Sequence, residues 1–220
     1  MVQVEIINIG DELLIGQVVN TNASQMAQKL NSYGFNVLAT SVIGDNKNQI
    51  RESLDIALKR ADCVLITGGL GPTKDDITKK ILAEYFNSDL IINTEVEEHV
   101  KSYFTRKQLP FAETNRAQAL VPENCKVIFN PVGTAPGMCF EKNGKLIVSM
   151  PGVPFEMRLM MDRVIEIMQT FFNQHTKILH KTLLYANIGE SFLSDMICDF
   201  EDNLPDYISL AYLPKSNTIR

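Results

Sequence analysis

Short apolar strands alternate with amphipathic helices along the first 175 residues. Between the strands, apolar positions recur at a helical period, as in residues 22–33, for which Thr21 or Asn22 is the expected N-cap. The expected strands of this type lie at residues 2–9, 35–43 and 64–67. Because strands and helices that alternate through short connections form right-handed crossovers, the pattern predicts a parallel sheet with helices on both faces.

The middle of the chain adds an antiparallel pair to this sheet. Residues 138–141 and 145–150 are apolar runs that flank Asn143-Gly144, a dipeptide that favours a two-residue hairpin. A long helix follows Pro154, with an expected apolar stripe at Phe155, Leu159, Met160, Val164, Ile167, Met168 and Phe171. We therefore expect an α/β fold of three layers, α/β/α, with a mostly parallel sheet.

The packed α/β pattern gives way to a new organisation near residue 175. The expected elements after it are a strand, a helix and a strand, at residues 182–188, 191–200 and 207–213. The predicted domains are therefore residues 1–175 and residues 176–220, the second being the start of a small α+β domain.

Composition limits the classes of function. The 220 residues are 45% hydrophobic and 21% charged, with a net charge of −5 and a pI near 5.3, which is ordinary for a globular protein and argues against broad nucleic-acid binding. The apolar runs are shorter than the roughly 18 residues that span a bilayer. We expect a cytoplasmic protein without a nucleic-acid or membrane partner, whose four scattered cysteines are reduced.

A glycine-rich turn is the strongest candidate for chemistry. Gly68, Gly69 and Gly71 follow a short β-branched strand, and a helical period begins at Ile77. Glycines let the backbone approach a ligand closely, and a helix start offers unpaired N–H groups with a positive dipole end. The turn therefore favours an anion such as a phosphate.

Two carboxylates in the same turn change this interpretation. Asp75 and Asp76 would repel a phosphate, which suggests a cation between the carboxylates and the ligand. The alternative is that Thr73 and Asp76 form only a capping box for the helix. Lys74 either neutralises a phosphate or lies in solvent.

Other turns supply further candidates. Gly10, Asp11 and Glu12 follow the first strand at its carboxyl end, where open α/β sheets bind ligands, although acidic residues also suit a helix start. Residues 131–137 form a rigid loop of small residues that suits the wall of a site. Glu156 follows a Pro-Gly turn, where it either contacts a ligand or stabilises the helix dipole.

These motifs resemble a known family. Thr67-Gly68-Gly69-Leu70-Gly71 with Asp76-Ile77-Thr78 resembles the signature of the molybdopterin-binding fold. Over residues 2–175 the chain looks like the amino-terminal domain of the CinA family of competence/damage-inducible proteins, on the motifs at residues 10–16, 21–22, 133–137 and 151–157. Residues 182–219 resemble the start of that family's KH-like middle domain. The resemblance places the family's nicotinamide-nucleotide amidase domain beyond residue 220.

The resemblance implies a function. It implies a metal-dependent ADP-ribose pyrophosphatase that forms a homodimer, and in molybdopterin enzymes the functional aspartates match Asp45 and Asp76. There the residue before the second aspartate is commonly arginine, but here it is Asp75, which favours metal-assisted chemistry. Two alternatives are a molybdopterin- or nucleotide-binding protein without hydrolase activity and a regulatory module that only senses ADP-ribose.

The residues combine into one mechanistic hypothesis. Asp76 and either Asp45 or Glu12 are the expected catalytic residues. A divalent cation, Mg²⁺, Mn²⁺ or Co²⁺, is expected on Asp75, Asp76 and Glu156. The expected ligand-binding residues are Gly10, Asp11, Gly68, Gly69, Gly71, Pro72, Thr73, Thr78, Gly133, Thr134, Ala135, Gly137, Pro151 and Gly152.

Overall fold

The computed structural model describes the backbone of residues 1–220 and every side chain except that of Thr114. The chain divides into two compact units, Met1–Ile178 and Leu179–Arg220. The elements of the first unit are β1 (Gln3–Ile9), α1 (Asp11–Leu14), α2 (Thr21–Ser32), β2 (Asn36–Ile43), α3 (Lys47–Arg60), β3 (Cys63–Thr67), α4 (Thr78–Tyr85), β4 (Leu90–Ile92), α5 (Thr94–Arg106), α6 (Glu113–Arg116), η1 (Ala117–Ala119), β5 (Leu120–Pro122), β6 (Lys126–Ile128), β7 (Gly137–Lys142), β8 (Lys145–Met150) and α7 (Pro154–Phe172).

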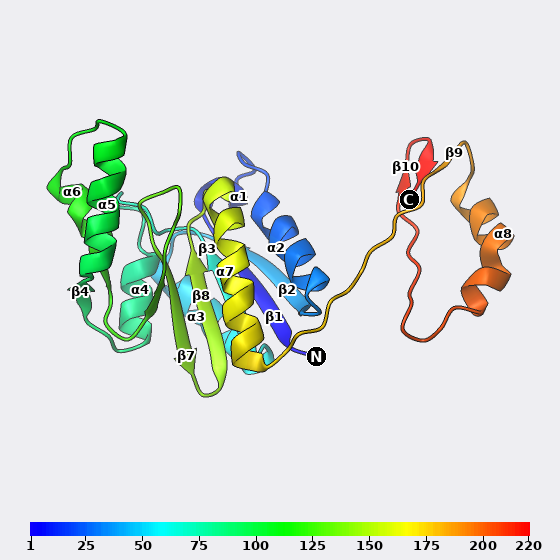
Figure 1. Ribbon diagram of the computed structural model, residues 1–220, viewed down its shortest axis with the longest axis horizontal. Coiled ribbons are helices and arrows are strands. Elements are labelled where there is room, and N and C mark those ends of the chain that lie inside the picture. Colours follow the sequence, from blue (N-terminus) through cyan, green and yellow to red (C-terminus); the bar gives the residue numbers. More distant parts are fainter. The chain divides into compact units, whose positions relative to one another are not determined.

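A six-stranded sheet forms the centre of the first unit, in the order β2-β1-β3-β8-β7-β6 (Figure 1). The strands β2, β1, β3 and β8 run parallel, and β7 and β6 each pair antiparallel with their neighbours. Asn143 and Gly144 between β7 and β8 both have positive φ, 52° and 74°, as a primed hairpin turn requires. The predicted mostly parallel sheet and its antiparallel hairpin are confirmed.

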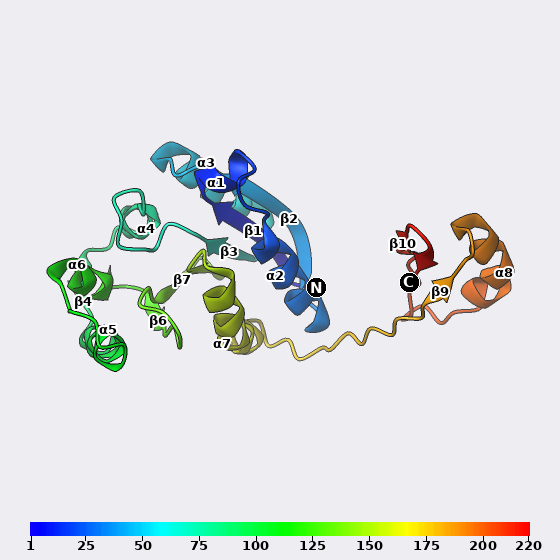
Figure 2. The ribbon, with the colours of Figure 1, turned by 90° about the horizontal axis from the view of Figure 1, so that it is seen from above.

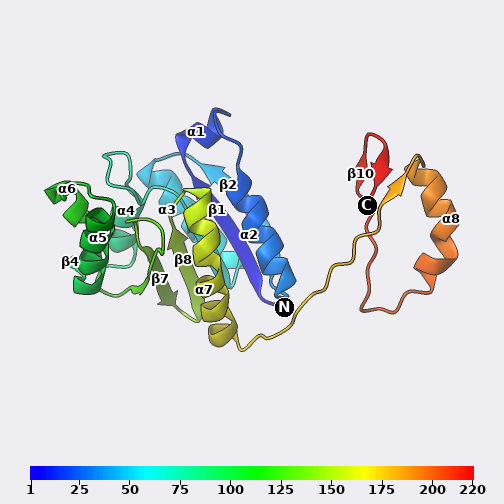
Figure 3. The same cartoon turned by 45° about the horizontal axis from the view of Figure 1, so that its top comes forward.

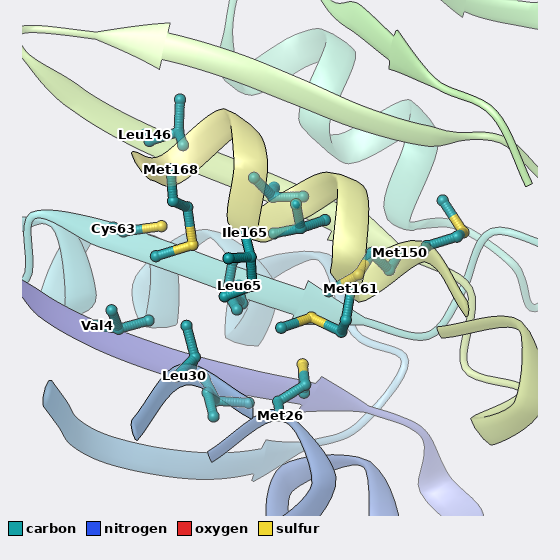
Figure 4. Packing of buried hydrophobic residues seen from close by; sticks show 14 of the residues in the cluster. Val4, Met26, Leu30, Cys63, Leu65, Leu146, Met150, Met161, Ile165 and Met168 are labelled. Atoms are coloured by element: carbon teal, nitrogen blue, oxygen red, sulfur yellow. The ribbon is translucent and has the colours of Figure 1, made fainter. Parts of the chain in front are cut away.

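Helices cover both faces of this sheet, so the three predicted layers are confirmed. On one face α2 and α7 pack against the sheet, and on the other face α3 and α4 do so (Figure 2). Figure 4 shows Met161, Ile165 and Met168 of α7 directed at Cys63 and Leu65 of β3. The central strand β3 is buried at all five positions, as expected where both faces of a parallel sheet are covered, whereas the edge strand β2 alternates exposed and half-buried residues over its first six positions.

A small subdomain lies between α4 and β6. Its strands β4 and β5 pair antiparallel, and α5 packs Val96 and Val100 against Ala119 of η1. Val127 of β6 also contacts this cluster, which ties the subdomain to the edge of the main sheet.

The first unit extends slightly beyond the predicted boundary at residue 175. The side-chain amide of Gln174 donates to the carbonyl of Gly34 at 2.6 Å, and the N–H of Ile178 donates to the carbonyl of Ser32 at 3.0 Å. These bonds attach the segment after α7 to the end of α2.

The second unit contains one helix and a three-stranded antiparallel sheet in the order β10-β11-β9. Its elements are β9 (Tyr185–Ala186), α8 (Glu190–Asp202), β10 (Pro214–Lys215) and β11 (Thr218–Ile219). The prediction of a strand at residues 207–213 is wrong. The pairing with β11 begins at Pro214, and the flanking Leu213 N–H donates to the carbonyl of Arg220 at 2.8 Å, so the ladder begins where that run ends.

Among the described residues, no helix is both long and apolar enough to cross a membrane. Cys63 and Cys139 are buried as free thiols, and burial raises the pKa of the Cys139 thiol to about 11. These two thiols are therefore protonated and unreactive near neutral pH.

Candidate functional site

A cavity of about 470 Å³ lies at the carboxyl ends of the four parallel strands. Asp45 follows β2, Gly10 follows β1, Gly68 follows β3 and Pro151 follows β8, and all four residues line the cavity. Figure 3 brings this end of the sheet forward, with α1 directly after β1. The loop between β6 and β7 and the first turn of α7 complete the wall.

Glycine is required in the floor of the cavity. Gly68 has a φ of 108°, and a Cβ atom there would overlap the carbonyl oxygen of Ile9. Gly69 has a φ of 67° and lies against the Thr78 hydroxyl in the same way. A Cβ atom on Gly152 would lie 3.3 Å from the Cα of Gly68, so strand ends approach each other closely and leave bare backbone for a ligand.

The cavity is lined by five separate segments of the chain, and these contain most of the residues that the sequence singled out. Ile9, Leu70 and Val153 also line it. The predicted residues in its lining are Gly10, Glu12, Asp45, Gly68, Gly69, Gly71, Pro72, Asp75, Asp76, Thr134, Ala135, Pro151, Gly152 and Glu156.

Five predicted ligand-binding residues stand outside the lining. Asp11 bonds to Asp45, and Thr73 bonds to Asp76, so both lie behind residues that do line the cavity. Thr78 is fully buried, and its N–H donates to the carbonyl of Gly69 at 3.1 Å. The remaining two are Gly133, which packs against Asn130 and Glu156, and Gly137, which packs against Met160.

The Thr73–Asp76 contact exists, but it does not cap α4. The N–H of Thr73 donates to Asp76 Oδ2 at 2.9 Å, and the Thr73 hydroxyl donates to the same oxygen. However, α4 begins at Thr78 after Ile77, and no side chain caps it. The contact therefore stabilises the turn that carries Asp76 to the cavity, rather than the start of the helix.

The Asp45 carboxylate lines the cavity, and its pKa is raised above its usual value. Burial raises its pKa, and the carboxylates of Asp11, Glu12 and Asp75 raise it further, although a hydrogen bond from the Asp11 backbone opposes them. Hydrogen bonding by the Thr73 side chain and the backbone instead lowers the pKa of Asp75. The cavity therefore holds carboxylates with opposite tendencies to accept a proton.

The charge of the cavity is negative. Among the described residues that line it, five are carboxylates and none is lysine or arginine, and Lys74 is exposed outside it. The described residues contain no cluster of three or more His, Cys, Asp or Glu side chains that is placed to hold a metal ion. The predicted trio Asp75, Asp76 and Glu156 is thus not a preformed site, because Asp76 turns to Thr73 and Glu156 turns to Asn130.

Two asparagines that support the cavity were missed from the sequence. Asn130 Nδ2 donates to Glu156 Oε2 at 2.7 Å, and Asn22 Nδ2 donates to the carbonyl of Gly152 at 2.8 Å. Asn22 was expected as a possible N-cap of α2, but Asn20 has that role and accepts from the N–H of Ala23. No local pattern signals either contact, because both partners are distant in sequence.

The sequence matches a described protein family. The family model of the probable molybdopterin binding domain covers residues 5–170. A CinA-like protein of Flavobacterium psychrophilum is 46% identical over 98% of this chain, and one of Chloroherpeton thalassium is 45% identical over 98%. The chain spans about half the length of these relatives, 52% in each case.

Solved structures share the fold. The protein CinA of Thermoplasma acidophilum, described as of unknown function, aligns with a TM-score of 0.68 and 32% identity, over 75% of this chain and 96% of that one. The molybdopterin biosynthesis enzyme MoaB of Thermus thermophilus aligns with a TM-score of 0.54 and 18% identity, over 79% of this chain and 98% of that one. At that identity the second likeness concerns the fold alone.

Proposed function

This chain belongs to the family of probable molybdopterin binding domains, and we propose that it hydrolyses the pyrophosphate bond of ADP-ribose or a related nucleotide with a divalent metal ion. One observation carries the proposal. Five carboxylates from four segments, the turns after β2 and β3 and the starts of α1 and α7, converge on a cavity whose floor is glycine backbone, and no lysine or arginine is among its described lining residues.

The floor suits a diphosphate, and the walls require a cation. Bare backbone at Gly68, Gly69 and Gly152 allows phosphate oxygens to approach closely. A dianionic ligand beside Asp75 and Asp76 would be repelled unless positive charge is supplied. Since Mg²⁺ usually binds one or two carboxylates together with phosphate oxygens of the substrate, the absence of a three-carboxylate cluster among the described residues fits a cation that arrives with the ligand.

In the proposed site, Asp76 and Asp75 would hold the cation, which when bound neutralises the phosphate charge and polarises phosphorus. Glu156, which also lines the cavity, would be a further carboxylate for the cation. The oxygen of a water molecule forms a bond to one phosphorus while the bond from that phosphorus to the bridging oxygen breaks. The products from ADP-ribose are AMP and ribose 5-phosphate.

Asp45 is the preferred base in this proposal, with Glu12 as the alternative. A carboxylate accepts a proton from water more readily when burial and like charges raise its pKa, as they do for Asp45. Asp45 lines the cavity beside Glu12, so either can reach a water molecule held there. The site thus separates a proton acceptor from the carboxylates that bind the cation.

Product analysis tests the proposal. The protein is incubated with ADP-ribose and with Mg²⁺, Mn²⁺ or Co²⁺ in turn, and the products are separated by chromatography. We expect AMP and ribose 5-phosphate in equal amounts, dependent on added metal and abolished by EDTA. Intact ADP-ribose with all three metals would contradict the proposal.

A second candidate function follows from the description of the matched family. The site would then bind molybdopterin or a related nucleotide without hydrolysis, with the pterin phosphate on the glycine floor. Calorimetric titration separates the candidates. Tight pterin binding without turnover of ADP-ribose favours the binding protein. Binding of ADP-ribose with neither pterin binding nor turnover favours a sensing module.

A further inference from the structure

Asn130 is at the centre of the hydrogen bonds that shape the loop between β6 and β7. Its side chain is buried, with 1% exposed. Asn130 Oδ1 accepts from the N–H groups of Val132 at 3.2 Å and Gly133 at 2.9 Å. Its Nδ2 donates to the carbonyl of Ala135 at 3.1 Å and to Glu156 Oε2 at 2.7 Å. One side chain thus closes the loop on itself and joins it to α7.

The orientation of this amide is fixed by its partners. A primary amide has two N–H donors and two acceptor lone pairs, and Asn130 uses all four. Rotation of the amide by 180° would turn its NH₂ group toward two N–H donors and its oxygen toward a carbonyl and a carboxylate. A buried group with four satisfied bonds is costly to displace, since each lost partner leaves an unpaired polar atom.

The loop, Asn130 and Glu156 are also packed in contact. A Cβ atom on Gly133 would lie 2.5 Å from Asn130 Nδ2 and 2.6 Å from the carboxyl carbon of Glu156, so a larger residue there would displace the Asn130 amide or the Glu156 carboxylate. From the other side, a ring nitrogen of His99 on α5 lies 3.2 Å from the carbonyl oxygen of Gly133. Since a carbonyl only accepts, His99 Nε2 carries the proton in this contact.

We propose that Asn130 is a positioning residue that sets the orientation of the Glu156 carboxylate and of the loop wall around the ligand. Asn130 does not line the cavity, whereas Thr134, Ala135 and Glu156 do. Because Asn130 donates to Oε2 of Glu156 and Glu156 lines the cavity, this hydrogen bond sets how the carboxylate is presented to the ligand or its cation. The consequence for catalysis rests on the proposed function, but the coupling between Asn130 and Glu156 does not.

A double-mutant cycle tests the coupling without any ligand. Amide hydrogen exchange at Val132 and Gly133 is measured by NMR in the wild type, Asn130→Ala, Glu156→Ala and the double variant. We expect ~10-fold faster exchange in Asn130→Ala, ~3-fold faster exchange in Glu156→Ala, and no further increase in the double variant. Unchanged exchange in Asn130→Ala, or two effects that multiply independently, would overturn the proposal.

Asn130→Asp tests the effect on the site. Aspartate keeps the acceptor for Val132 and Gly133 but replaces the donor to Glu156 with a second carboxylate. Because this variant also loses the hydrogen bond to Glu156, we expect exchange at both amides about as fast as in Glu156→Ala, ~3-fold above the wild type, with a KM for ADP-ribose at least ~10-fold higher and a smaller change in kcat. Wild-type KM in this variant would overturn the positioning role.

Asn124→Asp is the matched control, because the exposed Asn124 amide donates to the carbonyl of Phe86 outside the cavity. It should leave exchange and KM unchanged. If the wild type hydrolyses no ADP-ribose, the proposed function fails, and the exchange cycle alone then decides whether Asn130 positions Glu156.

Discussion

Asp11 and Asp45 bond to each other reciprocally through backbone and side chain. The N–H of Asp11 donates to Asp45 Oδ2 at 3.2 Å, and the N–H of Asp45 donates to Asp11 Oδ1 at 3.3 Å. The contact joins the turn after β1 to the turn after β2, and it holds two like charges side by side. Only Asp45 of this pair lines the cavity. The pair therefore fixes the Asp45 carboxylate in place at an electrostatic cost.

Asp45→Asn should stabilise the protein and inactivate it. The amide keeps an oxygen that accepts from the N–H of Asp11, but it removes repulsion from Asp11, Glu12 and Asp75. Because Asp45 is only partly buried and solvent screens the repulsion, we expect the melting temperature to rise by no more than about 1–2 °C, and hydrolysis of ADP-ribose to fall at least ~10²-fold. Calorimetry and the product assay measure the two effects. A variant that is active, or that melts below the wild type, would contradict this assignment.

The stabilisation should depend on pH in a defined direction. Because the folded state raises the pKa of Asp45 above its unfolded value of 3.8, the folded protein binds more protons between these two values. The advantage of Asp45→Asn is then complete above the folded pKa and disappears as pH falls to the unfolded pKa. Glu52→Gln, which removes an exposed charge on the outer side of α3, serves as the control and should show no such trend.

The edge of the sheet was predictable because its signals are local. Apolar runs of strand length mark the parallel strands, and their carboxyl ends necessarily meet at one edge, which brings Glu12, Asp45 and Asp76 together. The contacts of Asn130 and Asn22 were not predictable. Asn130 bonds to a residue 26 positions away, and Asn22 bonds to Gly152, 130 positions away. Such pairs depend on tertiary packing and leave no periodic trace in the sequence.

The apolar stripe of α7 was only partly predicted. Phe155 and Leu159 are 53% and 38% exposed, although the sequence placed them in the stripe. The buried side chains of the helix are Met157, Met160, Met161, Val164, Ile165 and Met168. The predicted stripe and the buried face share Met160, Val164 and Met168. The packing of α7 against α2 and β3 decides which of the neighbouring apolar side chains are buried. Hydrophobicity alone identified the helix, but it did not fix the rotation of its first two turns.

Lys79 should make stability depend on pH above neutrality. It is 8% exposed and lies on α4, and its Nζ donates to the carbonyls of Ala117 and Gln118 at 3.3 Å each. Burial lowers its pKa from 10.5 to about 8, so between these values the unfolded state binds more protons and the free energy of unfolding rises with pH. The contribution is roughly 3 kcal/mol across that window.

Urea denaturation of the wild type and Lys79→Met at pH 7.5 to 10 measures this effect. The free energy of unfolding should rise with pH in the wild type, and this rise should be absent in Lys79→Met. Cys63 and Cys139, whose pKa values are raised, act in the opposite direction in both proteins. Because the charge of Lys79 lowers the pKa of Cys125, both proteins carry Cys125→Ser, so that the difference between the two curves isolates Lys79. Parallel curves would show that Lys79 titrates normally.

Limited proteolysis should cut after Ile178 rather than directly after α7. The segment from Gln174 to Ile178 is bonded to the carbonyls of Gly34 and Ser32, whereas residues 179–184 are exposed and outside helices and strands. We expect trypsin to cut at Lys181 and to leave a folded fragment that ends there. Mass spectrometry identifies the site, and early cleavage at Lys177 would show that the tail is not held.

Asp75→Arg tests the departure from the arginine that is common before the second aspartate in molybdopterin enzymes. Asp75 is exposed at the mouth of the cavity, so arginine should be tolerated with little loss of stability. If Asp75 helps to hold a cation, the substitution should lower metal-dependent hydrolysis at least ~10-fold and raise affinity for a pterin phosphate. Unchanged hydrolysis would remove the reason for preferring the pyrophosphatase over the pterin-binding function.

Asp76→Asn separates a structural role of the turn from a chemical one. The Asp76 carboxylate accepts from the N–H and hydroxyl of Thr73, and an asparagine oxygen can accept the same bonds. If Asp76 has only a structural role, the Asp76→Asn protein should therefore lose at most ~1 kcal/mol of stability and keep its turnover of ADP-ribose. Because Asp76 also lines the cavity, we expect instead that hydrolysis falls at least ~10²-fold while the melting temperature changes little.

The matched variant is Thr73→Val, which removes the hydroxyl but keeps the backbone N–H that bonds to Asp76. It should reduce hydrolysis less than Asp76→Asn does, since the carboxylate and one of its two bonds remain. Steady-state kinetics with saturating metal measures both variants. If Thr73→Val lost as much activity as Asp76→Asn, the geometry of the turn rather than the charge of Asp76 would be the essential feature.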